Sequence, residues 1–228
     1  VSIYRELEIG TAKPSREFRA KIPHHLMDIR SIADSALPAS RPAYSAGEFA
    51  RDFFELLPRL PDPALVVGGT GFYIDAAVRG LAATPPASAD IRNRLAGEET
   101  SRPGALYEHL FRLDPAAAKK IGPANIQRLV RAIEVCELTG RKFSEHIRHP
   151  TDFKPTVFVL TPDRDTLYRS IELRARRMFS TGLPEEVEAL LRRFPPTLPA
   201  FAAPGYAETV RWVTGKCSID DAMAETVR

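Results

Sequence analysis

The sequence is poor in cysteine and has no long apolar run. Its 228 residues include two cysteines, Cys136 and Cys217. Two cysteines do not make a disulfide framework, and a reducing cytoplasm is the simplest interpretation. No apolar stretch approaches the ~18–20 residues that a membrane span needs, and no segment has the pattern of a signal peptide. We therefore expect a cytoplasmic protein with no membrane contact.

The chain also lacks an initiator methionine and a strong charge of either sign. It begins with Val1, which suggests a fragment of a longer protein. The net charge is only +3, so the total says little about partners such as nucleic acid. What is present is an ordinary globular composition, with 44% apolar and 27% charged residues. That composition allows a sizeable buried core.

Two short apolar runs have the pattern of buried strands, at residues 64–67 and 157–160, and residues 26–29 are a weaker third candidate. Continuous apolar runs are typical of parallel strands that are covered on both faces. A helical pattern follows each strong run, from about Phe72 and from about Asp165. The pattern predicts an α/β fold. Because three strands are too few for a doubly wound sheet, the sheet core is expected to be incomplete in this chain.

The middle of the chain predicts helices only. Between residues 89 and 146 the joints are Pro103-Gly104, Asp114-Pro115, Gly122-Pro123 and Thr139-Gly140. We expect a helical insertion at residues 85–148 between two parts of the α/β core, residues 1–84 and 149–228. Residues 33–43 have the composition of a surface loop.

Residues 68–71, Gly-Gly-Thr-Gly, directly follow the first predicted strand. Glycines there let the backbone approach a ligand closely, and the N–H groups that begin the next helix favour an anion. A tight strand-to-helix turn is the alternative. The segment is not a Walker A loop, because no Gly-Lys-Ser/Thr follows it.

The helix predicted from Asp165 carries an arginine on its apolar stripe. At about 100° per residue, Leu167, Ile171 and Met178 share one face, and Arg174 falls among them. A guanidinium on the core side is costly unless it is paired. Arg174 therefore meets a buried carboxylate, snorkels to solvent, or lines a cleft that holds an anion such as phosphate.

The helix expected at about residues 125–138 has two different sides. Its core stripe consists of Ile126, Leu129, Val130 and Ile133. The other side carries Gln127, Arg128 and Arg131. Glutamine and arginine together can contact base edges and phosphates, whereas a solvated helix face is the simpler alternative.

The segments just described, taken in order, resemble the bacterial tRNA dimethylallyltransferase (tRNA isopentenyltransferase) family. The resemblance covers nearly the whole chain. The matching segments are Tyr4-Arg5, Ile9-Gly10-Thr11-Ala12-Lys13-Pro14, Pro23-His24-His25-Leu26, Tyr44-Ser45-Ala46, Val67-Gly68-Gly69-Thr70-Gly71, Gln127-Arg128-Leu129, Leu138-Thr139-Gly140, Gly182-Leu183 and Gly205-Tyr206.

The resemblance implies a fold and an activity. The fold is similar to a P-loop kinase, with a nucleotide-binding (ATP-type) loop, a parallel sheet and an inserted helical domain that grips the tRNA anticodon stem-loop. The activity is transfer of a dimethylallyl group from dimethylallyl diphosphate to N6 of adenine 37, in tRNAs that read codons beginning with U. The adenine is flipped into a channel, and Mg²⁺ and basic groups hold the diphosphate. The protein is expected to be a monomer.

The resemblance also assigns roles by position. The expected tRNA contacts are Val1, Ser2, Thr70, Arg92, Gln127, Arg128, Leu129, Val130, Arg131, Phe201, Ala202, Ala203, Pro204, Gly205 and Tyr206. Arg174 and Thr70 are expected at the catalytic centre. Arg174, Arg164 and Arg169 are expected to bind the diphosphate, and the Mg²⁺ ligands are expected outside this chain.

The chain departs from the family pattern at several positions. The family's P-loop would lie about 30 residues before Val1, and its general-base Asp would directly precede the chain. Ser2 replaces the usual Gln, and Ala207 stands where a basic residue is common. We therefore expect the 228-residue chain to be inactive by itself. The alternatives are an adenylate isopentenyltransferase that acts on free AMP, ADP or ATP, and a non-catalytic RNA-binding module.

Overall fold

The computed structural model describes residues 2–36, 44–69 and 71–227. The chain divides into two compact units, one formed by residues 1–36 with 157–228, the other by residues 37–156. In the described ranges the regular structure is helical, and β pairing is limited to the isolated bridges Tyr4–Arg30 and Ala82–Arg148. The expected boundaries after residues 84 and 148 stay a prediction.

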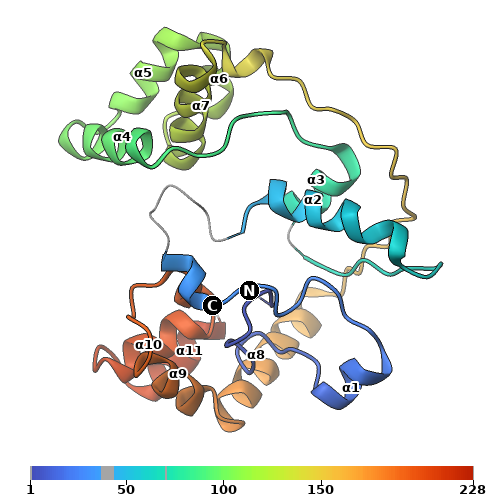
Figure 1. Ribbon diagram of the computed structural model, residues 1–228. Helices are drawn as coiled ribbons and strands as arrows, with labels where there is room; N and C mark the ends of the chain where they lie inside the picture. Colours follow the sequence, from blue (N-terminus) through green and yellow to red (C-terminus); the bar gives the residue numbers. More distant parts are fainter. Residues whose placement is uncertain (1, 37–43, 70, 228) are drawn as a thin grey trace. The chain divides into compact units, whose positions relative to one another are not determined.

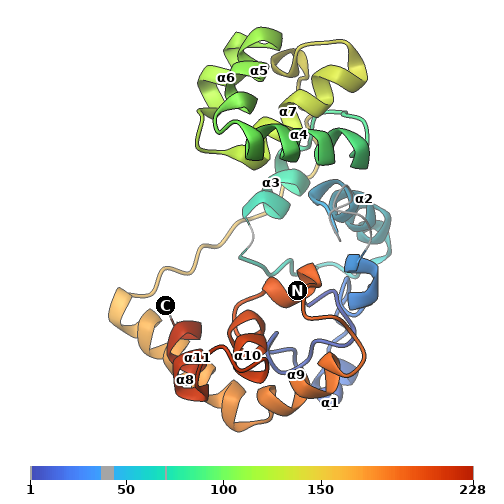
Figure 2. The same cartoon turned by 90° about the vertical axis from the view of Figure 1, so that its left-hand side faces the viewer.

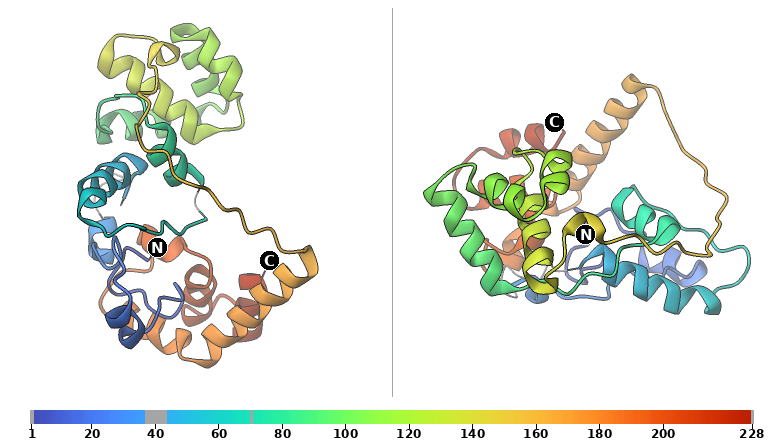
Figure 3. Two further views of the ribbon diagram at one scale, coloured as in Figure 1. Left: turned by 90° about the vertical axis from the view of Figure 1, so that its right-hand side faces the viewer. Right: turned by 90° about the horizontal axis from the view of Figure 1, so that it is seen from above.

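The predicted parallel sheet core is wrong, and the fold is mainly helical. Residues 64–67 and 157–160 form no strand among the described residues: Val67 is 91% exposed and Leu160 is 91% exposed. A strand needs a neighbour for its backbone N–H and C=O groups, and no described segment pairs with either run. Figure 3 shows the second run as an unpaired thread that leads into the next helix. At residues 26–29, Leu26 and Asp28 have φ angles of 57° and 58°, which no β-strand accommodates.

The unit of residues 37–156 contains α2 (Ala46–Leu56), η2 (Leu57–Arg59), α3 (Gly71–Arg79), α4 (Ala89–Ser101), α5 (Ala105–Leu113), α6 (Pro115–Ile121), α7 (Ile126–Thr139) and η3 (Phe143–Glu145). Helices α4 to α7 pack as a bundle (Figures 1 and 2). The bundle core consists of Leu95, Leu106, Leu110, Ala117, Ala118, Leu129, Ala132, Ile133 and Cys136. Cys136 is thus a buried apolar side chain, as expected of a free cysteine in a helix core.

The bundle helices begin and end at the residues that the sequence indicates. Asp114 caps α6, where its carboxylate accepts the Ala117 N–H at 3.0 Å. Asn125 caps α7 by accepting the Arg128 N–H at 3.2 Å. Gly140 ends α7 in the left-handed conformation at φ 66°, which glycine adopts without steric cost. The predicted helical middle and its joints are therefore confirmed.

The other unit contains α1 (Arg16–Lys21), η1 (Ile32–Ala36), α8 (Arg164–Ser180), α9 (Leu183–Leu191), η4 (Pro199–Ala202), α10 (Tyr206–Val213) and α11 (Ile219–Val227). Helix α10 packs against α9 and α11, and α11 packs against α8.

Residues 37–43, most of the predicted surface loop, lie outside the described residues. No helix in the described ranges is both long enough and apolar enough to cross a membrane.

Candidate functional site

Helix α7 holds a buried carboxylate between two arginines. Glu134 is fully buried and accepts hydrogen bonds from Arg92 Nε at 2.9 Å, from Arg131 Nη1 and from the Ser88 N–H at 2.8 Å. Burial raises the pKa of Glu134, but the hydrogen bonds from Arg92, Arg131 and Ser88 outweigh it and hold the pKa below its ordinary value. The carboxylate therefore stays ionised and fixes both guanidinium groups.

Arg131 is fixed on a second side as well. Its Nη2 donates to Thr84 Oγ1 at 2.9 Å and to the Pro85 carbonyl at 2.8 Å. The side chains of Arg92 and Arg131 remain 23% and 30% exposed. Two guanidinium groups share one carboxylate, so one positive charge is left over. Such a preorganised, partly exposed cation suits a phosphate oxygen.

Two of the predicted RNA contacts, Arg92 and Arg131, are thus brought together by a residue to which the sequence reasoning assigned no role. The available signal was the position of Glu134 in the helix. It lies four residues after Val130, so it falls on the stripe that faces the core. An acidic residue on an apolar stripe, three residues after an arginine, predicts a buried ion pair.

The other predicted tRNA contacts on α7 differ in how far their side chains are exposed. Gln127 and Arg128 are exposed at the first turn of the helix. Leu129 is fully buried in the bundle core, and Val130 packs against that core. Of these four side chains, Gln127 and Arg128 are therefore the ones that present their functional groups to a partner.

The predicted segment at residues 201–206 lies in the other unit, where η4 meets α10. Phe201 and Tyr206 are buried, whereas Ala202 and Pro204 are exposed. Ala203 and Gly205 are buried, and Gly205 has φ 87°.

The Tyr206 hydroxyl belongs to a buried network that holds the N-terminal segment. It donates to Glu186 and accepts the Gly10 N–H at 3.2 Å. Glu186 also accepts the backbone N–H groups of Glu8 at 3.1 Å and Ile9 at 2.8 Å. Burial, together with the hydrogen bond to Glu186 and its charge, raises the pKa of Tyr206 far above its ordinary value. Tyr206 is thus a neutral donor that holds residues 8–10 against α9 and α10.

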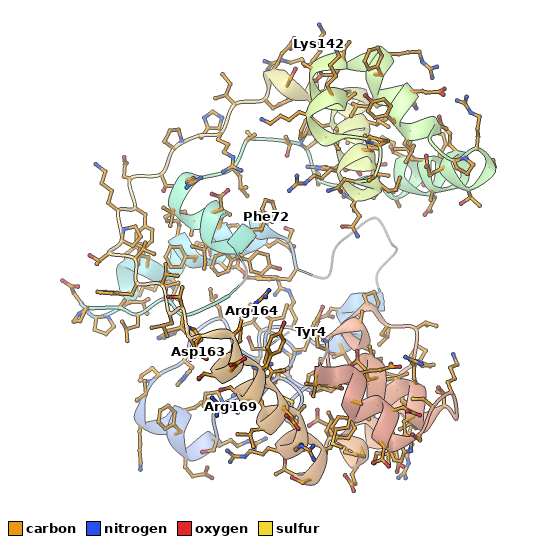
Figure 4. The ribbon with its side chains drawn as sticks, turned by 180° about the vertical axis from the view of Figure 1, so that it is seen from behind. Tyr4, Phe72, Lys142, Asp163, Arg164 and Arg169 are labelled. Atoms are coloured by element: carbon orange, nitrogen blue, oxygen red, sulfur yellow. The ribbon has the colours of Figure 1, made fainter. Side chains whose placement is uncertain are left out.

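The predicted diphosphate contacts lie on α8 and are exposed. Arg164 and Arg169 stand on the first part of the helix (Figure 4), and Arg174 is exposed further along it. Arg174 therefore does not face the core as its stripe position indicated. The reason is that α8 buries only Ala175 and Met178. The role of the three arginines in diphosphate binding stays a prediction.

The remaining predictions concern Val1, Ser2, Thr70 and the metal. Val1 and Thr70 lie outside the described residues. Ser2 is half-buried, and its carbonyl accepts the Asp28 N–H at 3.1 Å. Across the described ranges, no group of three or more His, Cys, Asp or Glu side chains is arranged to hold a metal ion.

Comparisons with known proteins agree over nearly the whole chain. A family model described as "IPP transferase" matches residues 2–228. The tRNA dimethylallyltransferase of Halorhodospira halophila is 42% identical, over 94% of this chain and 70% of that protein. The tRNA dimethylallyltransferase of Koribacter versatilis is 40% identical, over 98% of this chain and 73% of that protein.

Solved structures are similar as well. The full-length tRNA isopentenylpyrophosphate transferase of Bacillus halodurans matches with a TM-score of 0.61 and 30% identity, over 100% of this chain and 71% of that chain. A eukaryotic dimethylallyltransferase acting on tRNA matches with a TM-score of 0.78 over 99% of this chain and 57% of that chain, at 22% identity, which is a likeness of fold alone. From the family match and the identity to its members, the chain belongs to the IPP transferase family.

Proposed function

We propose that this chain belongs to a cytoplasmic enzyme that transfers a dimethylallyl group from dimethylallyl diphosphate to N6 of adenine 37, in tRNAs that read codons beginning with U. The observation that carries the proposal is the 42% identity to a tRNA dimethylallyltransferase over 94% of the chain. The exposed Gln127 and Arg128 and the partly exposed Arg92 and Arg131 support an RNA substrate.

The proposed reaction is a substitution at carbon. The N6 amine forms an N–C bond to the first carbon of the dimethylallyl group, and the C–O bond to the diphosphate breaks. The diphosphate leaves with the electron pair, and the amine loses a proton. Arg164, Arg169 and Arg174 are the proposed donors to the leaving diphosphate, whose charge the guanidinium groups stabilise. Mg²⁺, when bound, would neutralise charge on the same group.

The activity test uses the full-length gene product. It is incubated with dimethylallyl diphosphate, Mg²⁺ and a tRNA that carries adenines at positions 36 and 37, with AMP as a competing acceptor. We expect prenylation of adenine 37 and none of AMP. Absence of tRNA prenylation would overturn the proposal, and prenylation of AMP instead would indicate an adenylate isopentenyltransferase.

Arg128→Gln is expected to weaken binding of an anticodon stem-loop RNA several-fold. Arg128 is exposed and makes no ion pair with a described residue, so the fold should not change. Loss of one phosphate contact should reduce the slope of log affinity against log salt by about 0.7–0.9. Fluorescence anisotropy at several salt concentrations measures both quantities.

The matched control is Arg112→Gln. Arg112 is exposed on α5 of the same bundle and likewise makes no ion pair with a described residue. Arg112→Gln removes the same charge as Arg128→Gln, but outside the predicted RNA-binding surface. Equal effects of the two substitutions would show that α7 has no special part in RNA binding.

A further inference from the structure

Helix α1 and the segments on either side of it form an open pocket with a volume of about 650 Å³. Its ionisable lining residues are Arg5, Glu8, Arg16, Arg19, His24 and Asp28. All of them belong to one unit, and none has been assigned a role above. Figure 1 shows α1 at the edge of this unit, away from α10 and α11.

Asp28 fixes the floor of the pocket. Its two carboxylate oxygens pair with Lys13 Nζ and Arg19 Nη1, each at 2.5 Å. The Lys13 side chain is 1% exposed and Arg19 is 17% exposed. One carboxylate is thus shared by two cations, so this group keeps a positive charge. The ion pairs also hold the Arg19 guanidinium in one orientation.

The other charges in the pocket are not balanced. Arg16 makes no ion pair with a described residue, and the Arg5 guanidinium donates to the Asp28 carbonyl at 3.3 Å. The lining residues thus include three arginines against the two carboxylates of Glu8 and Asp28, an excess of one positive charge. Arg19 Nε is buried and has no acceptor among the described residues.

His24, one of the lining residues, supplies an aromatic ring to the pocket, and Phe18 packs against that ring. Phe18 on α1 is 49% exposed, and its ring centre lies 5.9 Å from that of His24. His24 Nδ1 lies 2.6 Å from the Ile22 carbonyl, so this nitrogen carries the proton and Nε2 is left for a partner. Guanidinium groups beside an aromatic face are the combination that binds phosphate and stacks on a base in single-stranded nucleic acid.

We propose that this pocket, with Arg5, Arg16 and Arg19 on its walls beside the His24 ring, binds a backbone phosphate of the RNA substrate and stacks on a neighbouring base. The inference rests on the proposed function and adds a second RNA contact, made by residues other than those of α4 and α7. The diphosphate of the prenyl donor shares the phosphate chemistry. The His24 ring among the arginines favours RNA, because a dimethylallyl diphosphate has no base to stack.

The test is the double variant Arg5→Gln/Arg16→Gln in the full-length protein, with a tRNA transcript as the probe. Neither arginine forms an ion pair with a described residue, so the fold should persist. We expect a five- to tenfold loss of tRNA affinity and a salt slope reduced by about 1–2. The KM for dimethylallyl diphosphate should not change. Phe18→Ala, which removes the ring packed against His24, should lower the affinity several-fold at an unchanged salt slope, because it removes no charge.

The matched control is Arg192→Gln/Lys216→Gln, which removes two exposed positive charges from the same unit. If the double variant binds tRNA as this control does while Arg128→Gln weakens binding, the pocket proposal is overturned and the proposed function stands. If the KM for dimethylallyl diphosphate rises while tRNA affinity is unchanged, the assignment to RNA is wrong. If the unaltered protein binds no tRNA, the proposed function itself fails.

Discussion

Replacement of Glu134 by alanine is expected to destabilise the α4–α7 bundle by about 2–4 kcal/mol. Removing one member of a buried ion pair typically costs about 3–5 kcal/mol, because the partner charge is left without compensation. Here Arg92 and Arg131 keep 23% and 30% exposure, and solvent therefore screens part of the loss. The substitution also removes the acceptor of the Ser88 N–H, just before α4 begins.

Urea unfolding followed by far-UV circular dichroism measures this loss. Glu137→Ala is the matched control, since Glu137 lies on the same helix and pairs with Arg94 at 2.5 Å, but its side chain is 24% exposed. A pair of this kind should cost about 1 kcal/mol or less. If Glu134→Ala is no more destabilising than Glu137→Ala, Glu134 does not hold the two arginines.

Glu134→Gln separates the charge from the shape of the side chain. The pKa of Glu134 is held below its ordinary value of 4.5 in the fold, so its ionised form contributes stability above that pH. The contribution is lost as the pH falls from about 4.5 through the lowered pKa. The stability difference between wild type and Glu134→Gln should therefore be largest near neutral pH and shrink in acid. Asp114, whose pKa is also lowered, makes the same pH-dependent contribution to the stability of both proteins, so its contribution cancels in the difference.

The sequence predicted local structure well where local chemistry determines it. Capping residues and glycines such as Asn125 and Gly140 act within one turn of the helix, so the limits of α7 follow from the residues themselves. The apolar runs at residues 64–67 and 157–160 failed as predictors of a sheet, because strand formation depends on a partner far away in the sequence.

The candidate site was predicted in part for the same reason. Residue types and helical spacing indicate that Arg128 is available at the surface. They do not show that Arg131 is anchored by Thr84 and Pro85, which lie more than forty residues away. Arg174 was predicted on the core side, which requires the apolar face of α8 to be covered along its whole length. Only Ala175 and Met178 of this helix are buried, so Arg174 remains exposed.

Gly10→Ala is expected to destabilise the unit that contains α8 to α11 by about 1–3 kcal/mol, the usual cost of overpacking. A Cβ atom on Gly10 would lie 2.4 Å from Tyr206 Cε2 and 3.0 Å from Leu183 Cδ1. Both neighbours are fully buried, so neither can move away at low cost. The clash would also displace the hydroxyl that accepts the Gly10 N–H and donates to Glu186.

Trp212 is the single tryptophan of the chain and lies on α10, so its fluorescence during urea unfolding reports on this unit. Gly97→Ala is the control: Gly97 lies inside α4 with no atom within 4 Å of an added Cβ. That substitution should stabilise the bundle by about 0.5–1 kcal/mol, measured by far-UV circular dichroism during urea unfolding, because alanine loses less backbone entropy in a helix. It should leave the Trp212 transition unchanged. A Gly10→Ala protein as stable as wild type would mean that Tyr206 moves freely. The network through Glu186 would then not be what holds residues 8–10 against α9 and α10.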